Sequence, residues 1–254
     1  MSYKRIQRKD AVMNGRYTKI IILLIVGIFL ITACGSNYIK GSGNVVKEER
    51  EVSGFDRIDM SGYGEVIITQ GNEESLTIET DDNLLEYIES NVRNNTLYLE
   101  FTDNTIPDPS GTITYRMNVI NLEALELSGA GSFNIQSLDT SSIGITFDGA
   151  GKIDLDSLNA DEVSLQINGT GDVDLGGKVG KQDIHIKGAG KYSAPDLQSN
   201  QATVQIDGVG KVVIWVIDSL DIKVEGAGNV DYYGSPSVTQ DIKGGGSIQS
   251  LGEK

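Results

Sequence analysis

The chain is poor in the residues that most often carry chemistry. Its 254 residues include one cysteine, one histidine and one tryptophan, and only 6% are aromatic. A single cysteine excludes an intrachain disulfide and a metal site built from cysteines. The lone histidine, His185, has no Gly-x-Ser-x-Gly motif beside it to suggest a Ser-His-Asp triad. These shortages predict a protein that is not an enzyme and that needs no cofactor or metal.

Positive charge is also scarce. The chain carries a net charge of −15, and because residues 1–34 hold six basic residues and one acidic residue, the remainder carries −20. Such an acidic surface repels nucleic acid, so we expect no nucleic-acid partner. It also disfavours a lyase of acidic polysaccharides, which would need a cationic groove. Beyond residue 34 the only arginines are Arg50, Arg57, Arg93 and Arg116.

Residues 1–34 predict a bacterial lipoprotein signal peptide. Basic residues precede an apolar run at residues 20–31, which is short for a full membrane span. Residues 31–36 read Ile-Thr-Ala-Cys-Gly-Ser and resemble a lipobox, in which the cysteine receives the lipid. The resemblance implies lipidation of Cys34 and a lipid-anchored, extracytoplasmic location in the cell envelope. An uncleaved signal anchor is the alternative.

A Gly-x-Gly tripeptide recurs every 18–20 residues in the second half of the chain. Apolar residues alternate with polar ones on both sides of each copy, as Leu165 and Ile167 do before Gly169 and Val173 does after it. This alternation indicates two short strands per repeat, and the constant period indicates stacked units. The first glycines of the copies are Gly129, Gly149, Gly169, Gly188, Gly208, Gly226 and Gly244.

Two stackings fit this repeat. In an antiparallel meander each Gly-x-Gly would be a hairpin tip, which suits Asp148-Gly149 and Asn168-Gly169. In a parallel solenoid the same corner stacks on itself, which suits the small middle residues. We favour the solenoid and predict an all-β fold: a single-stranded parallel β-helix of 18–21-residue coils, right-handed by the crossover rule.

The repeat weakens toward the N-terminal side. We expect a linker or the start of the domain at 35–44, irregular coils at 45–121 and regular coils at 122–250 of a β-helical domain that spans 45–254. A separate subdomain between 72 and 121 is the alternative. Residues 82–92 predict a short helix with Leu84, Leu85, Ile88 and Val92 on one face, capped by Asp81 or Asp82. Gln240 and Ser250 replace apolar residues in the last coil, as a terminal cap should.

Three segments in order resemble a known family. Residues 52–71 read Val-Ser-Gly-Phe-Asp-Arg-Ile-Asp-Met-Ser-Gly-Tyr-Gly-Glu-Val-Ile-Ile-Thr-Gln-Gly, the Gly-x-Gly array follows, and residues 230–236 read Val-Asp-Tyr-Tyr-Gly-Ser-Pro. Over residues 45–235 the chain is similar to the bacterial family described as putative auto-transporter adhesin, head GIN domain. The resemblance implies a β-helical fold on secreted or envelope-anchored proteins, and it implies no demonstrated activity or functional residues.

Two groups of side chains could bind a ligand. Asp154 with Asp156, and Asp172 with Asp174, place two carboxylates on one strand face, where a solvated role is favoured over weak calcium binding or glycoside chemistry. Trp215 is predicted to face outward and could stack on sugars. Tyr233 is also predicted to face outward, whereas Tyr192 and Tyr232 occupy core positions.

These features favour a non-enzymatic envelope lipoprotein that acts in adhesion or surface interaction. The expected partners are the membrane, through the N-terminal lipid, and glycans or proteins of the envelope or of a host surface. A polysaccharide-active β-helix enzyme, either a lyase or a hydrolase, is one alternative. A periplasmic accessory protein is the other.

Overall fold

A computed structural model describes residues 37–102 and 105–254. Cys34 and the rest of the predicted signal peptide lie outside the described residues. The chain divides into two units, 1–37 and 38–254, and the second is described below. Within the described residues, no helix combines the length and apolarity needed to cross a membrane.

Strands make up most of the second unit, and one short 3-10 helix interrupts them. The elements are β1 (Asn37–Lys40), β2 (Val45–Arg50), β3 (Arg57–Met60), β4 (Tyr63–Gln70), β5 (Ser75–Asp81), η1 (Asp82–Tyr87), β6 (Ile88–Arg93), β7 (Thr96–Phe101), β8 (Thr105–Asp108), β9 (Thr114–Val119), β10 (Ala124–Leu127), β11 (Ala130–Asp139), β12 (Ser142–Phe147), β13 (Ala150–Ile167), β14 (Thr170–Ile186), β15 (Ala189–Ile206), β16 (Val209–Val224), β17 (Ala227–Tyr233), β18 (Ser237–Ile242) and β19 (Gly245–Gly252).

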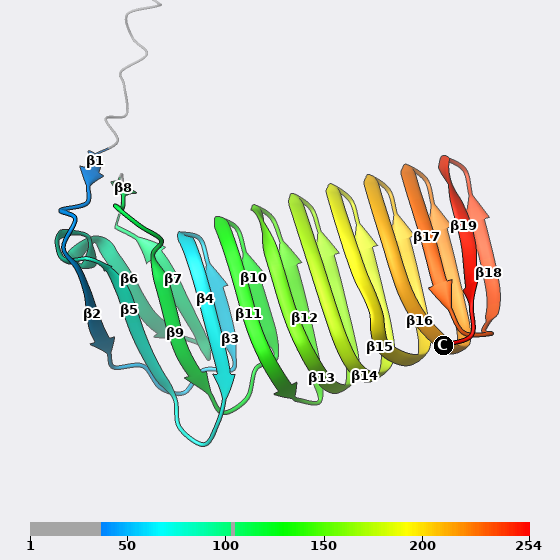
Figure 1. The fold of residues 1–254 in the computed structure, drawn as a ribbon, viewed down its shortest axis with the longest axis horizontal. Coiled ribbons are helices and arrows are strands. Elements are labelled where there is room, and N and C mark those ends of the chain that lie inside the picture. Colours follow the sequence, from blue (N-terminus) through cyan, green and yellow to red (C-terminus); the bar gives the residue numbers. More distant parts are fainter. Residues whose placement is uncertain (1–36, 103–104) are drawn as a thin grey trace, which may run out of the picture. The chain divides into compact units, whose positions relative to one another are not determined.

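The regular coils stack in parallel, as Figure 1 shows from β10 to β19. Strand β13 pairs in parallel with β14, and β14 with β15, so that Gly151, Gly171 and Gly190 lie directly on one another. The parallel solenoid is therefore confirmed, and the hairpin alternative is wrong. Each coil runs down from its Gly-x-Gly turn, passes a second turn and returns. We call these second turns the lower turns (for example residues 156–162; bottom of Figure 1).

The apolar residues that alternate around each Gly-x-Gly point inward and form one continuous core. We call each column of equivalent inward residues from successive coils a ladder. Ile167, Val173 and Ile186 each expose 0% of their surface. Equivalent residues from successive coils pack on one another, because the parallel register keeps each position directly above its counterpart. Burying such side chains drives the folding of a coil that cannot cover its own apolar face.

Both glycines of the repeat are required by close approach. A Cβ added to Gly169 would lie 2.0 Å from the carbonyl oxygen of Gly149 in the coil before it. A Cβ added to the second glycine of the next repeat, Gly190, would lie 2.6 Å from Cδ1 of Ile167 in the core. The first glycine thus lets backbones stack at the turn, and the second leaves room for the ladder residue beneath it.

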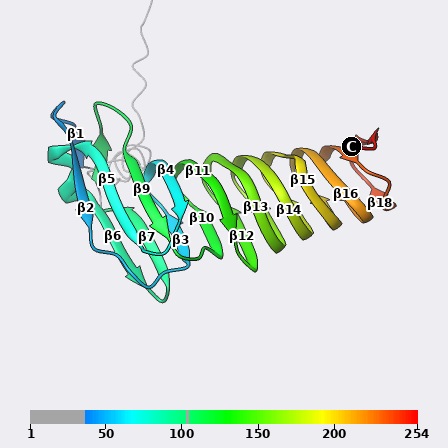
Figure 2. The ribbon, with the colours of Figure 1, turned by 60° about the horizontal axis from the view of Figure 1, so that its bottom comes forward.

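Residues 45–121 build the same sheets with different pairings. Strand β2 lies antiparallel to β5, β5 antiparallel to β9, and β6 antiparallel to β7. Strands β3 and β4 nevertheless pair in parallel with β10 and β11 of the array, and one hydrophobic core spans both regions. Figure 2 shows this end of the stack beside the regular coils. The region continues the array without a break in sheet or core.

The predicted helix at 82–92 is wrong in extent. Only Asp82–Tyr87 is helical, as one 3-10 segment, and Ile88–Arg93 form β6. The residues Leu84, Leu85 and Ile88 are buried as expected, but Val92 faces Leu97 across the β6–β7 pair. Asn94 and Asn95 adopt positive φ and form a tight turn between β6 and β7, so the backbone of this segment pairs with β7 and does not continue the helix.

Asp81 does not cap this helix through its side chain; its carboxylate instead ties two loops together. It is fully buried and accepts hydrogen bonds from the Gly43 N–H at 2.6 Å and from the Ser110 N–H and hydroxyl, each at 2.8 Å. Burial raises the pKa of Asp81, but the hydrogen bonds from Ser110 and Gly43 outweigh it and hold that pKa below its ordinary value.

Candidate interaction surface

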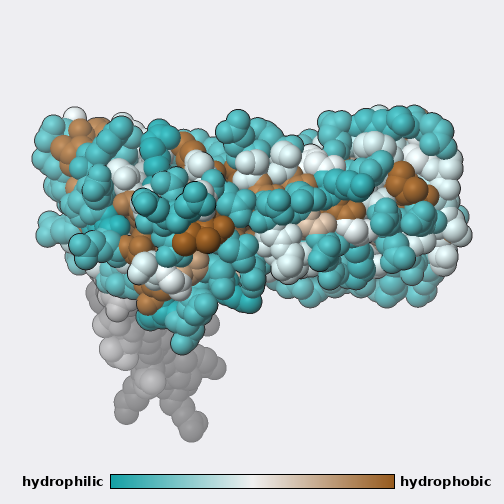
Figure 3. Space-filling view, turned by 90° about the horizontal axis from the view of Figure 1, so that it is seen from below, coloured by the Kyte–Doolittle hydropathy of each residue, from teal (hydrophilic) through white to brown (hydrophobic). Residues whose placement is uncertain are grey.

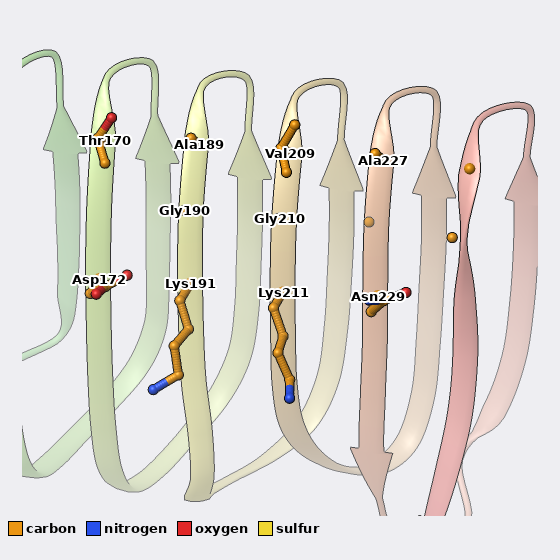
Figure 4. Close-up of a pocket in the computed structure, with 13 residues that line it drawn as sticks. Thr170, Asp172, Ala189, Gly190, Lys191, Val209, Gly210, Lys211, Ala227 and Asn229 are labelled. Carbon is orange, nitrogen blue, oxygen red and sulfur yellow. The ribbon is translucent and has the colours of Figure 1, made fainter.

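A shallow groove of about 710 Å³ runs along the coils beside the Gly-x-Gly turns. Small outward residues form its upper row and mostly charged residues form its lower row, because every second residue of each strand faces out. Figure 4 shows Lys191 and Lys211 extending away from the turns along their strands. The groove is long and open, with no set of reactive groups converging in it. The upper row contains Thr170, Ala189, Val209 and Ala227, and the lower row Asp172, Lys191, Lys211 and Asn229.

Ion pairs link the carboxylates next to this groove. Lys152 Nζ lies 2.6 Å from Asp154 and 3.8 Å from Asp174, and Lys191 Nζ lies 3.6 Å from Asp174. The hydrogen bond that Lys152 donates to Asp154 raises the pKa of Lys152. Both carboxylates face solvent as predicted and are paired with lysines. Among residues 37–102 and 105–254, no three His, Cys, Asp or Glu side chains are arranged to hold a metal ion.

A second hollow, of about 280 Å³, lies near the lower turns. Asp154, Asp156 and Asp174 line it together with Asp196 and Ser193. The structure thus brings together one predicted carboxylate pair and half of the other, since Asp172 lies on the groove instead. We call this hollow the acidic pocket.

His185 is half-buried on the outer face and contacts one carboxylate. Its Nε2 lies 2.7 Å from Oδ2 of Asp207. The hydrogen bond with Gln205 and, as the second cause, the one with His185 lower the pKa of Asp207. No hydrogen bond among the described residues joins His185 to a serine hydroxyl, so the geometry of a Ser-His-Asp triad is not present there.

The predicted aromatic residues separate into core and surface. Trp215 and Tyr233 are register partners on β16 and β17, both half-exposed. Lys254 Nζ lies 5.3 Å from the Trp215 ring centre and 5.4 Å from that of Tyr233, within reach of a cation–π contact. Lys254 also donates hydrogen bonds to Asp196 and to the carbonyl oxygen of Pro195. We call Trp215, Tyr233 and Lys254 the aromatic shelf.

The aromatic shelf adjoins the acidic pocket, since Pro195 and Asp196 belong to the pocket and also hold Lys254. The C-terminus beside the lower turns in Figure 1 marks this place. Figure 3 faces the lower turns and shows a mostly hydrophilic surface with small, separate apolar areas. The shelf therefore combines flat apolar rings with carboxylates on an otherwise polar face.

Sequence patterns did not reveal a buried polar network beneath this face. The Tyr192 hydroxyl donates to Gln182 at 2.7 Å, Gln182 Nε2 donates to Ser199 Oγ at 2.9 Å, and all three residues are fully buried. Burial raises the pKa of Tyr192. Tyr192 lies in the core as predicted, whereas Tyr232 is only partly buried. Ser199 occupies an inward position of a lower turn and Gln182 one just after a lower turn, where no Gly-x-Gly marks the register.

The family model described as putative auto-transporter adhesin, head GIN domain, matches residues 54–236. The chain belongs to this family. The match spans most of the irregular region and most of the regular coils, as the opening motif, the array and the closing motif predicted. No curated protein matches the chain.

Solved structures share the fold. A putative adhesin from Bacteroides fragilis is 27% identical with a TM-score of 0.79, covering 84% of this chain and 100% of that one. A putative adhesin from Parabacteroides distasonis is 20% identical, with a TM-score of 0.65 and coverage of 85% and 100%. A putative lipid binding protein from the same species is 22% identical, with a TM-score of 0.64 and the same coverage. The family and the Bacteroides neighbour support an adhesin-like function and a cell-surface or extracellular location.

Proposed function

We propose that this protein is a lipid-anchored, non-enzymatic adhesin of the cell envelope that contacts neutral glycans through the aromatic shelf. The observation that carries the glycan contact is the in-register pair Trp215 and Tyr233 beside the carboxylates of the acidic pocket. Tyrosine and tryptophan rings offer a flat apolar face and a polar tip, which suits the faces and hydroxyls of sugars. The parallel coils hold both rings on a rigid support.

Charge narrows the class of glycan. Asp154, Asp156 and Asp174 line the hollow next to the shelf, and ionised carboxylates accept hydrogen bonds from sugar hydroxyls. The same carboxylates repel uronic acids and sulfated sugars. The ligand that fits is therefore a neutral polysaccharide.

Binding of the full chain to mannan and dextran, with polygalacturonate as the acidic comparison, tests this contact. We expect binding to at least one neutral polymer, weakened at least tenfold by Trp215→Ala and retained in part by Trp215→Phe. Tyr98→Ala is the matched control, because Tyr98 is a half-exposed aromatic residue under Arg93 on β7, far from the shelf in the sequence. Binding that is stronger to polygalacturonate, or equal in Trp215→Ala, would count against the shelf.

The lipid anchor rests on residues 31–36 and on the basic and apolar segments before them. We expect the chain to incorporate labelled fatty acid, and Cys34→Ser to abolish the label and leave an unprocessed precursor. A wild-type chain that takes up no label and keeps its first residues would contradict the anchor and leave the glycan contact untouched.

A non-enzymatic role is supported by the way the charged groups pair with one another. Asp174 is shared between Lys152 and Lys191, and His185 is engaged by Asp207. All four arginines beyond residue 34 lie outside the regular coils. Release of reducing ends from any of the three polymers by the pure protein would instead support the enzyme alternative.

A further inference from the structure

The last coil of the solenoid leaves two strand edges open. Strand β18 pairs with β16 and β19 pairs with β17, and in the part of the chain that the structure describes no strand pairs with the outer edge of either. Ile242 exposes 40% of its surface and Leu251 38%. An open edge presents unpaired N–H and C=O groups to any strand that can reach them.

Residues 253 and 254, which follow β19, do not cover these edges. Lys254 bonds to Asp196 on β15 and lies over Trp215 on β16, so residues beyond Gly252 run back beside earlier coils. Among the residues that the structure describes, this end is therefore formed by β18 and β19 themselves.

The two ends of the stack differ in charge. At the N-terminal end, the outer strand β2 carries Lys47, Glu48, Glu49 and Arg50. At the C-terminal end, β19 carries no charged residue, and Asp241, the one charge on β18, is paired with Lys243 at 3.0 Å. Charges on an edge strand normally prevent edge-to-edge pairing. The C-terminal end has less of that protection, because β18 and β19 together carry one charged residue and β2 alone carries four.

We propose that the C-terminal coil docks a second copy of this chain, end to end, by antiparallel pairing of the β18 and β19 edges about a two-fold axis. Identical strands related by a two-fold axis can pair antiparallel, and the same patch then serves both copies. A second copy of this acidic chain is repelled by most of the surface, so the end with the fewest charged residues on its edge strands is where it fits best. Such a dimer is closed and does not grow into a filament.

The size of the end face sets the expected strength. A strand of eight residues spans roughly 27 Å, and two sheets with their side chains are roughly 20 Å thick, so each copy buries about 500 Å². That area is at the lower limit of specific interfaces. We therefore expect a micromolar dimer, which attachment to one membrane surface would favour by raising the local concentration.

Sedimentation of the full chain carrying Cys34→Ser, in density-matched detergent and across micromolar concentrations, tests the proposal. We expect a monomer–dimer equilibrium, with the dissociation constant raised at least tenfold by Thr239→Lys/Gln249→Lys. The matched control is Thr203→Lys/Val213→Lys, which adds the same charges to the same outward rows two coils earlier and should leave the dimer intact.

Cross-linking keeps the test decisive if the double lysine variant does not fold. In the Cys34→Ser chain, Thr239→Cys should be cross-linked to a second copy by a short bis-maleimide, and Thr203→Cys should not. A chain that stays monomeric overturns the proposal and leaves the edges to a strand of another protein. A dimer that persists in the C-terminal variant, or an assembly larger than a dimer, overturns it as well.

Discussion

The irregular region at 45–121 and the regular coils at 122–252 build one pair of sheets by different means. In the regular coils, identical turns stack so closely that the carbonyl oxygen of Gly149 occupies the place of a side chain on Gly169. In the irregular region, antiparallel pairs close the end of the stack, and a buried carboxylate, Asp81, fixes the loops around them. The array therefore depends on backbone contact, and the irregular region on particular side-chain contacts.

The largest expected effect comes from a side chain placed where two turns touch. Gly169→Val should prevent folding or cost more than about 4 kcal/mol, because even a Cβ would overlap the backbone of the preceding coil. Gly71→Val is the matched control in the irregular region, where a Cβ meets nothing within 4 Å, and should cost about 0.5 kcal/mol or less. Urea unfolding followed by circular dichroism measures both. Equal costs would show that stacking at the turn does not support the array.

A smaller effect should separate the middle of the array from its end. Ile167→Ala leaves a cavity in a fully buried ladder and should cost about 2–5 kcal/mol. Ile248→Ala should cost less than half as much, because Ile248 is only partly buried on the last coil and packs on one side. Unfolding midpoints of the two variants provide the test, and a cost at Ile248 equal to that at Ile167 would contradict the open end.

Loss of a carboxylate charge should destabilise the protein when the carboxylate lies in the irregular region, and should have little effect when it lies on the array. Asp81→Asn should cost about 1–3 kcal/mol, since a buried ionised acceptor of three hydrogen bonds becomes a neutral amide. The comparison is Asp156→Asn, at an exposed position of the array, which should be nearly silent.

The pH dependence follows from the lowered pKa of Asp81. The folded state holds this carboxyl ionised to lower pH than the unfolded chain does, whose pKa is about 3.9. The stability that the ionised group contributes is therefore present above that value and is lost as pH falls through the folded pKa. Wild-type protein should lose more stability than Asp81→Asn between neutral and acidic pH. An identical loss of stability in both proteins would show that Asp81 does not contribute to the destabilisation at acidic pH.

The array was predictable because the same sequence signal recurs in every coil. Gly-x-Gly at a fixed period indicated stacked units, and its small middle residues favoured the parallel stacking. The alternation around it predicted the buried positions, including Ile167 and Tyr192. The irregular region has no repeat to set its register. There, local apolar spacing was compatible with a helix at 82–92, and long-range pairing of β6 with β7 decided against it.

The candidate surface was predictable only in part, for a related reason. Strand alternation placed Trp215, Tyr233 and Asp154 on the outside correctly, because orientation is a local property of a strand. Which outward residues gather was set by the stacking. Lys254 approaches Trp215, and Gln182 is buried beside a lower turn, through contacts between coils that only the folded chain brings together.

The smallest expected effect tests whether the outer face of the array is as tolerant as the comparison implies. His185→Gln removes the 2.7 Å contact with Asp207. Both side chains are partly exposed, and contacts of this kind typically contribute about 0–1 kcal/mol. Glutamine can also donate a hydrogen bond to Asp207, so the net change in unfolding free energy should stay within about 0.5 kcal/mol. A loss above about 2 kcal/mol would show that His185 supports the coil as Asp81 supports the loops, and the distinction between backbone contact in the array and side-chain contact in the irregular region would fail at that position.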